Sequence, residues 1–449
     1  MRRLFGTDGI RGVANRYPMD GGTAFSVGQA IACLARRLIS APKVVIGRDT
    51  RLSGCMLESA AAAGIMSMGG QPLLVGVLPT PGVAFVTKAL GAQAGVVISA
   101  SHNPYADNGI KVFSGAGFKL SDEQEEEVEE LLFSGELPDL AVFPAEMGRS
   151  CLVEDAILRY RAFLKSSFPP SLSLKGLRLV LDTANGATFQ VAPPVFTELG
   201  AEVTVIHDRP DGLNINENCG SEHTEDLRRA VVERGADLGL AFDGDGDRLV
   251  AVDEKGVQLT GDQVLLICAY TLKQEGRLKN DLVVSTVMSN LGFHAACRKL
   301  GIKNYAAKVG DRYVLEELLR RDGVLGGEES GHVVFLEHHT TGDGILTGLQ
   351  LVAALLKADK PLSEMAQLME VYPQRLINVL VKSKPALEEI PGLAEAIAQA
   401  EKELGDEGRV LVRYSGTQNL CRVMVEGPTA EVADKHAQEI ARVVRTVLG

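Results

Sequence analysis

Short apolar runs alternate with segments of helical periodicity along most of this chain. The runs at 43–46, 73–77 and 95–98 are apolar almost throughout, which predicts buried strands. Between the first two runs, small apolar residues follow Ser53, and we expect Ser53 to cap a helix there. Strands that alternate with helices predict α/β layers.

The alternation continues in later blocks, and the last block differs from the others. A second block begins with the strand-like 177–182, and a third includes 282–286. The last block has strand-like runs at 409–412 and 423–425, followed by an amphipathic helix from about residue 430. We therefore predict three related α/β domains with mixed sheets plus a smaller C-terminal α+β domain around a central cleft. The predicted domains are 1–168, 169–256, 257–371 and 372–449.

In each predicted α/β domain an apolar strand runs into a short polar loop. These loops are 99–104, 243–248 and 327–332. Ligands bind at the carboxyl ends of strands in open α/β sheets. We therefore expect the three loops to meet at one shared cleft.

The strongest chemical signal lies between two apolar runs, where Asp243, Asp245 and Asp247 alternate with glycines and precede Arg248. Carboxylates this close raise one another's pKa unless a cation compensates them. Oxygen ligands with no Cys or His nearby favour Mg²⁺ over zinc. A magnesium ion held by few protein groups usually works on a phosphate, so we predict a magnesium site that handles one.

Two other interpretations of this loop stay open. Asp-Gly between apolar runs also signals a β-hairpin, although a hairpin needs only one such pair. The spacing matches a calcium-binding EF-hand as well, with the three aspartates at positions 1, 3 and 5 and Glu254 at position 12. The match fails at position 6, where Arg248 replaces the glycine of the sharp turn. Magnesium stays the favoured interpretation.

Two further groups are candidates for the chemistry. Ser101-His102 resembles a serine hydroxyl activated by a histidine, but no third group completes a hydrolase triad. The alternative interpretation is a polar turn before Pro104. Beside Mg²⁺, a phosphoserine passes on its phosphoryl group. Lys111, on the strand-like 109–113, is either a solvated lysine or a general acid or base near Ser101.

A third loop has the composition of a sugar site. Glu328, Ser330 and His332 occupy alternate positions, so an extended loop would present all three side chains to one side. Such a row suits the hydroxyl or amino groups of a sugar, and an ordinary polar turn is the alternative.

A fourth loop has the composition of a phosphate site. Arg413, Ser415, Gly416 and Thr417 lie within five residues and offer a guanidinium fork, two hydroxyls and a glycine amide. This favours a phosphate clamp over a simple β-turn. The glycine-rich start at 5–12 lacks the pattern of a P-loop, so nucleotide binding is not predicted.

The bulk composition limits the partners. The chain has 449 residues, 45% of them hydrophobic and 23% charged, and a formal net charge of −12. That charge argues against nucleic acid or an anionic membrane as partner. We expect no signal peptide and no membrane span. We predict a monomer or homodimer that acts on a small molecule. We also predict a cytoplasmic location, because scattered cysteines fit a reducing compartment. The cysteines are Cys33, Cys55, Cys151, Cys219, Cys268, Cys297 and Cys421.

Taken together, these motifs resemble those of the α-D-phosphohexomutases. The resemblance runs from 5–12 to 413–417, with the three loops between them in the same order. It implies an isomerase that moves a phosphate between the 6 and 1 positions of a hexose through a phosphoserine and a bisphosphorylated sugar. It also implies one Mg²⁺ ion per chain and a sugar 1,6-bisphosphate as activator.

Carried over residue by residue, the resemblance implies a role for each candidate. Ser101 is the expected phosphoserine and, with Asp243, Asp245 and Asp247, a metal ligand. The other residues expected around the moving phosphoryl group are His102, Lys111, Arg248 and Arg11, with Lys111 in proton transfer. Those expected to bind substrate are Asp311, Glu328, Ser330 and His332 for the sugar, and Arg413, Ser415, Gly416 and Thr417 for the phosphate that is not reacting.

Within the family, the motifs at 6–12, 309–314 and 415–417 favour glucosamine 6- and 1-phosphates, on the route to UDP-N-acetylglucosamine and peptidoglycan precursors. Mannose or glucose phosphates are the nearest alternative substrates. A catalytically silent sugar-phosphate sensor is an alternative of a different class. The last loop departs from the family pattern, because Gln418-Asn419 stands where Glu-Pro is usual, which removes a charge and a rigid φ from the clamp.

Overall fold

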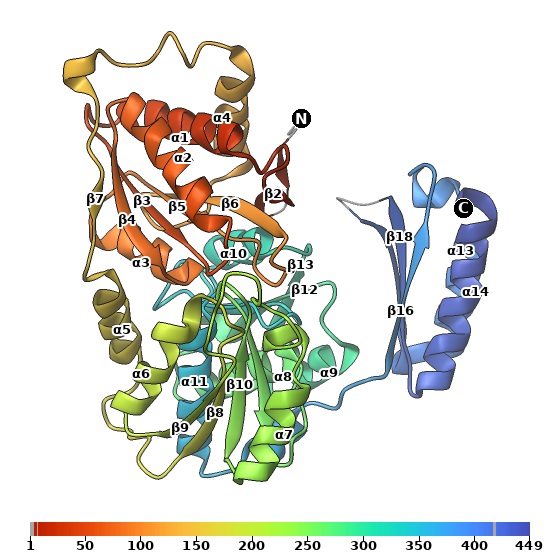
Figure 1. The fold of residues 1–449 in the computed structure, drawn as a ribbon. Coiled ribbons are helices and arrows are strands. Elements are labelled where there is room, and N and C mark those ends of the chain that lie inside the picture. Colours follow the sequence, from red (N-terminus) through yellow and green to blue (C-terminus); the bar gives the residue numbers. More distant parts are fainter. Residues whose placement is uncertain (1–3, 7, 416–418) are drawn as a thin grey trace. The chain divides into compact units, whose positions relative to one another are not determined.

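The computed structural model describes residues 4–6, 8–415 and 419–449. The chain forms two compact units (Figure 1). The first unit comprises Met1–Met288 and Ile302–Leu368, and the second comprises Ser289–Gly301 and Met369–Gly449. Within the described ranges, no helix combines the length and the apolar character needed to cross a bilayer.

The first sheet of the first unit is mixed. Its strand order over the described residues is β1-β2-β6-β5-β3-β4-β7, with β3 parallel to β4 and β5, and β6 antiparallel to β5. Its strands are β1 (Phe5–Gly6), β2 (Gly9–Val13), β3 (Lys43–Arg48), β4 (Gln71–Val77), β5 (Ala94–Ile98), β6 (Asp107–Ser114) and β7 (Cys151–Leu152). The helices in this part of the chain are α1 (Gly21–Arg36), α2 (Gly54–Ser67), α3 (Thr80–Ala89), α4 (Asp122–Ser134) and α5 (Ala156–Ser167).

Alternation along β3 explains why helices cover both faces of this sheet. Val44 and Ile46 join the hydrophobic core formed with α1 and α2. Gly47 points the other way, and a side chain there would collide with Val83 of α3. Successive strand residues point to opposite faces, so a strand covered on both faces is apolar throughout, as the sequence pattern predicts.

The helix predicted after Ser53 is present as α2, but the predicted cap is wrong. Ser53 has helical backbone angles, φ −67° and ψ −16°, and its side chain makes no capping hydrogen bond. A serine caps from an extended backbone, which aims its hydroxyl at the first free amides. The Ser53 Oγ instead accepts a hydrogen bond from Asn108 Nδ2 at 2.8 Å. Ser121, with extended angles, does cap α4 together with Gln124.

The second and third sheets of the first unit are also mixed. Over the described residues their orders are β11-β10-β8-β9 and β13-β12-β14-β15. The strands are β8 (Arg178–Asp182), β9 (Glu202–Ile206), β10 (Leu238–Phe242), β11 (Leu249–Asp253), β12 (Leu282–Thr286), β13 (Lys303–Ala307), β14 (Leu325–Gly327) and β15 (Val333–Phe335). The helices are α6 (Ala192–Glu198), α7 (Glu225–Arg234), α8 (Gly261–Gln274), α10 (Asp311–Arg320), α11 (Gly344–Ala358) and α12 (Leu362–Met365).

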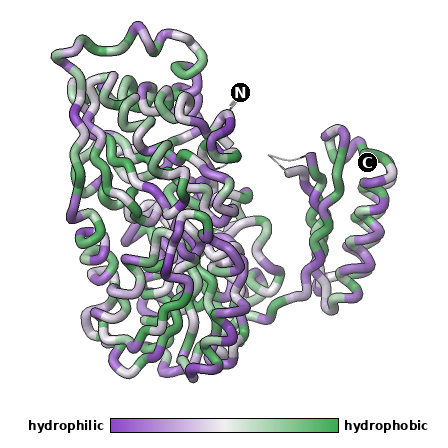
Figure 2. Tube along the Cα trace, in the orientation of Figure 1, coloured by the Kyte–Doolittle hydropathy of each residue, from purple (hydrophilic) through white to green (hydrophobic). Residues whose placement is uncertain are grey.

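The second unit is built on an antiparallel sheet of order β16-β18-β17. Its elements are β16 (Gln374–Leu380), β17 (Arg409–Tyr414), β18 (Leu420–Glu426), α9 (Leu291–Lys299), α13 (Leu393–Leu404) and α14 (Ala430–Leu448). Hydrophobic and hydrophilic residues alternate along α14 (Figure 2), whose Ile440 and Val444 join the same hydrophobic core as Val423 of β18. The predicted fold class, three mixed α/β sheets and a smaller α+β part, is confirmed. The predicted domain boundaries stay a prediction.

Candidate active site

The three polar loops of the first unit meet, as the sequence pattern predicts. The loop after β5 contacts the loop after β10, where Ser101 Oγ donates a hydrogen bond to Asp243 Oδ2 at 2.6 Å. The loop after β14 reaches the same place, with His332 Nδ1 at 3.7 Å from Asp247 Oδ2. The carboxyl ends of strands from three sheets therefore share one polar centre.

Ser101 is held in an unusual backbone conformation at this centre. Its φ is 54°, in the left-handed region that non-glycine residues rarely adopt, and its side chain is buried. Its Oγ also lies 3.3 Å from His102 Nδ1. Burial and the Arg248 guanidinium lower the pKa of His102 to about 4, so this imidazole is neutral at neutral pH.

A buried ion pair supports the Ser101 loop, and sequence reasoning missed it. Arg51 Nε lies 2.9 Å from Asp49 Oδ2, and the Arg51 guanidinium donates to the carbonyls of Ser101 at 3.0 Å and Asn103 at 2.7 Å. Asp49 in turn accepts from Ser99 Oγ at 2.6 Å, and Ser99 Oγ accepts from the Ser101 amide at 2.9 Å. The available signal was Asp49-Thr-Arg51 at the end of an apolar strand, which by itself names no function.

Arg51→Ala is expected to destabilise the protein by about 3–5 kcal/mol, because it leaves a buried Asp49 carboxylate and several carbonyls without their donor. The midpoint of urea unfolding, followed by circular dichroism, measures this loss. Arg48→Ala is the matched control, since the Arg48 pair with Glu58 is partly exposed and costs about 1 kcal/mol or less. Equal midpoints for the two variants would contradict the supporting role of Arg51.

The three aspartates after β10 form a buried cluster that fits a divalent cation. One carboxylate oxygen of each lies within 4.8 Å of the others. Burial and the carboxylates of Asp247 and Asp245 raise the pKa of Asp243 well above its ordinary value. Asp245 Oδ1 and Asp247 Oδ1 are buried and have no hydrogen-bond partner among the described residues. Hard oxygen donors with free lone pairs suit Mg²⁺.

The two competing interpretations of this loop have different outcomes. β10 and β11 are antiparallel, with Phe242 opposite Leu249, so the aspartates do lie on the connection of a β-hairpin. The hairpin and the carboxylate cluster are thus both present. The EF-hand interpretation is excluded, because strands flank the loop and Glu254 accepts hydrogen bonds from Ser363 instead of joining the cluster.

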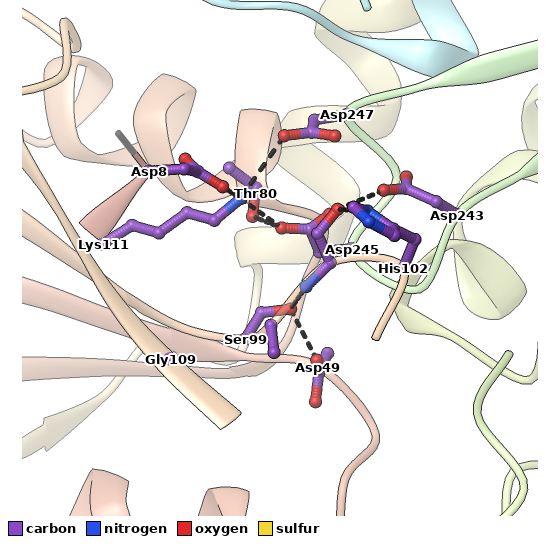
Figure 3. Close-up of polar contacts among 12 residues, drawn as sticks. Asp8, Asp49, Thr80, Ser99, His102, Gly109, Lys111, Asp243, Asp245 and Asp247 are labelled. Carbon is purple, nitrogen blue, oxygen red and sulfur yellow. Dashed lines mark hydrogen bonds and ion pairs between the residues drawn. The ribbon is translucent and has the colours of Figure 1, made fainter. Parts of the chain in front are cut away.

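Lys111 is buried, which excludes the solvated lysine. Its Nζ lies 2.9 Å from Asp245 Oδ2, 3.1 Å from Asp8 Oδ2 and 3.4 Å from Asp247 Oδ2 (Figure 3). Burial opposes its charge, but these three carboxylates outweigh burial and raise the pKa of Lys111 well above its ordinary value. Lys111 is therefore an ammonium group in this arrangement.

Lys111 is one member of a closed ring of alternating basic and acidic side chains. The residues of this ring come from the parts of the chain that form all three sheets of the unit. Asp8 bridges Lys111 and Lys119, and Lys119 also binds Asp311. His332 closes the ring, with its two nitrogens each 3.7 Å from a carboxylate oxygen, one of Asp311 and one of Asp247. Sequence reasoning missed Asp8 and Lys119. Asp8 lies in the glycine-rich start of the chain, where only Arg11 was singled out.

The two predicted arginines also lie at this centre. Arg11 donates to the Ala100 carbonyl at 3.1 Å, next to Ser101. The Arg248 amide donates to Asp243 Oδ1 at 3.2 Å, and its Nε lies 3.9 Å from Asp247 Oδ1. Arg11 also pairs with Asp8, so both guanidiniums lie beside carboxylates of this centre.

The predicted extended loop at 327–332 is wrong. The Gly331 amide donates to the Glu328 carbonyl at 3.0 Å, which makes a tight turn between β14 and β15. The turn separates the three side chains, because Ser330 is exposed while His332 is buried. Glu328 turns inward, and its Oε1 accepts from the Gly310 amide at 2.9 Å. Glycine at 331, with φ 88°, is what allows the turn.

The predicted phosphate clamp lies in the second unit. Arg413 on β17 is paired across the sheet with Arg422 on β18, and burial and Arg422 lower the pKa of Arg413. The Ser415 carbonyl accepts from Lys384 Nζ at 2.7 Å. Sequence reasoning missed Arg422 and Lys384, which concentrate positive charge beside Ser415. Gly416, Thr417 and Gln418 lie outside the described residues.

The whole chain matches known proteins. Four segments match the domains of phosphoglucomutase/phosphomannomutase: α/β/α domain I at 2–139, domain II at 159–256, domain III at 260–372 and the C-terminal domain at 376–443. Proteins named phosphoglucosamine mutase from Syntrophobacter fumaroxidans and Syntrophus aciditrophicus are 62% and 56% identical to it, with 100% of each chain covered.

Solved structures share the fold at low identity. A putative phosphomannomutase from Thermus thermophilus superposes with a TM-score of 0.79 at 23% identity, covering 98% of both chains. An N-acetylphosphoglucosamine mutase from Aspergillus fumigatus, solved with GlcNAc-6P and magnesium, superposes with a TM-score of 0.70 at 18% identity, covering 100% of this chain and 96% of that one.

Proposed function

This chain belongs to the phosphoglucomutase/phosphomannomutase family, and from that premise we propose that it interconverts glucosamine 6-phosphate and glucosamine 1-phosphate through a phosphoserine at Ser101. Full-length relatives at 62% and 56% identity bear the name of this enzyme, which disfavours a silent sensor. The single observation that supports the mechanism best is the position of the Ser101 hydroxyl. It is buried, and its Oγ lies 2.6 Å from Asp243 Oδ2.

The reaction we propose moves one phosphoryl group at a time. The phosphoserine gives its phosphoryl group to a sugar hydroxyl, so that the bond to Ser101 Oγ breaks as the bond to the sugar oxygen forms. The resulting sugar 1,6-bisphosphate then reorients, so that its other phosphate faces Ser101, and it returns that phosphoryl group to Ser101. We assign the proton exchange with the sugar hydroxyl to Lys111, and charge stabilisation to Arg11 and Arg248.

We assign the metal site to Asp243, Asp245 and Asp247, with Mg²⁺ as the ion and Ser101 as a further ligand. The three buried carboxylates and their free lone pairs support this assignment. A Mg²⁺ ion held there would neutralise the phosphoryl charge and also the charge of Asp245 and Asp247, two of the three carboxylates that raise the pKa of Lys111.

We assign substrate recognition to two further groups. Glu328, Asp311 and His332 would face the sugar, with Ser330 at the rim of the turn. Burial raises the pKa of Glu328, because the ionised carboxylate is poorly solvated there. A cationic group of the substrate would stabilise that ionised carboxylate. The protonated amino group of glucosamine is such a partner, whereas glucose and mannose carry an uncharged hydroxyl in its place. Arg413, Ser415, Gly416 and Thr417 would bind the phosphate that is not reacting.

A panel of sugar phosphates tests the substrate. With Mg²⁺ and a bisphosphate activator present, we expect kcat/KM for glucosamine 1-phosphate to exceed the values for glucose 1- and mannose 1-phosphate by at least about tenfold, or about 1.4 kcal/mol. The reason is the ion pair that only the amino sugar forms with the buried acids. A tenfold preference for glucose or mannose would contradict the assignment of glucosamine.

A further inference from the structure

A second group of metal-ligand side chains lies in the second sheet, at the carboxyl ends of β8 and β9. Asp182 is the last residue of β8, and His207 follows the last residue of its parallel neighbour β9. Cys219 lies on the segment that runs on from β9. One ligand atom of each of the three residues lies within 4.8 Å of the other two.

Two of these side chains are buried. The Asp182 carboxylate accepts hydrogen bonds from the amides of Ala184 and Gly220, both at 2.9 Å, which fixes its position. The Cys219 side chain is 1% exposed. Burial and the Asp182 carboxylate raise the pKa of Cys219 to about 12, so the free thiol keeps its proton.

His207 is oriented as a metal ligand is. Its φ of 51° lies in the left-handed region, so its backbone is constrained. Its Nε2 lies 3.3 Å from Asp226 Oδ2 of α7. Its Nδ1 lies 3.0 Å from Asp182 Oδ2, so the imidazole faces that carboxylate directly. A carboxylate on the nitrogen that faces away from the cluster is typical of a metal-binding histidine.

We propose that Asp182, His207 and Cys219 bind one Zn²⁺ ion, with water as the fourth ligand. A nitrogen, an oxygen and a sulfur form a ligand set that zinc accepts and magnesium does not. The positive charge of the ion would displace the thiol proton and balance the Asp182 carboxylate. This site is separate from the aspartate cluster after β10 and does not depend on the proposed mutase function.

The zinc site has a structural role in the proposal. Its ligands lie at both ends of the segment 208–218, which carries Asn216. Asn216 Nδ2 donates to the carbonyls of Ser101 at 2.9 Å and Asn103 at 3.0 Å. An ion that joins His207 to Cys219 therefore holds the segment that supports the Ser101 loop.

Metal content and cobalt spectroscopy test the site without using activity. Protein purified in magnesium buffer is expected to contain one zinc per chain by elemental analysis. After removal of metal with a chelator, Co²⁺ is expected to give a thiolate-to-cobalt charge-transfer band, which the all-oxygen aspartate cluster cannot produce. Cys219→Ser is expected to lose the zinc and the band, and zinc is expected to raise the melting temperature of the wild-type chain but not that of Cys219→Ser.

Cys268→Ser is the matched control, because Cys268 is a buried thiol whose pKa burial also raises to about 12, and it lies on α8 outside the cluster. This variant is expected to keep the zinc. His207→Gln, at a partly exposed side chain, repeats the test if Cys219→Ser does not fold. A wild-type chain that binds no zinc, or zinc and cobalt spectra unchanged in both ligand variants, would overturn the proposal.

Discussion

Ser101→Ala is expected to lower kcat by about 10⁴-fold or more, the order of effect of removing a covalent nucleophile from an enzyme. The variant has no oxygen to carry the phosphoryl group, while the neighbouring carboxylates and Lys111 stay in place. Intact-mass spectrometry after incubation with a sugar 1,6-bisphosphate is expected to show a phosphorylated species for the wild-type chain and none for the variant. A coupled assay with saturating Mg²⁺ measures the rate.

Ser121→Ala is the matched control for the serine replacement. Ser121 caps α4, so its loss costs about 1 kcal/mol of stability without touching the polar centre. This control is expected to keep both its activity and the phosphorylated species. Activity in Ser101→Ala close to that of the wild type would refute the phosphoserine mechanism.

Asp245→Asn is expected to reduce kcat/KM at physiological Mg²⁺ by at least about 100-fold. Replacing a residue that only orients a metal ligand already lowers metal affinity or activity by about 10- to 100-fold, and Asp245 is assigned as a ligand itself. The amide has one oxygen where the carboxylate has two, and it carries no charge. Asp245 Oδ2 is already occupied by Lys111 at 2.9 Å and Thr80 at 2.6 Å, so Oδ1 is the oxygen available to a cation. The Mg²⁺ concentration for half-maximal activity is expected to rise.

Asp253→Asn provides the comparison for this variant. Asp253 ends the same hairpin and is also buried, but it accepts hydrogen bonds from the amides of Lys255 and Val257. Its replacement is expected to leave the Mg²⁺ requirement unchanged. If Asp245→Asn has the same Mg²⁺ requirement as the wild-type chain, the aspartate cluster is not the magnesium site.

Some candidate sites could be recognised in the sequence because their residues lie close together along the chain. The three aspartates share one loop, so their mutual repulsion, and the need for a cation, follow from spacing alone. The turn at 327–332 shows the limit of this reasoning. Alternation predicted a row of three side chains, but Gly331 closes a tight turn that leaves only His332 and Glu328 facing inward.

The sequence by itself determined the element types, the strand-end loops and the choice of oxygen ligands for a hard cation, because these depend on neighbours within a few residues. Only the tertiary structure decided that Ser101 meets Asp243 across 142 positions of the chain and that Lys111 is buried among carboxylates. It also revealed Arg51 beneath the serine loop and His207 beside Cys219. Such pairs are set by the packing of sheets and loops remote in sequence. The pattern of strands predicted that the three loops meet, but no local pattern of hydrophobic and polar residues records which side chains come into contact there.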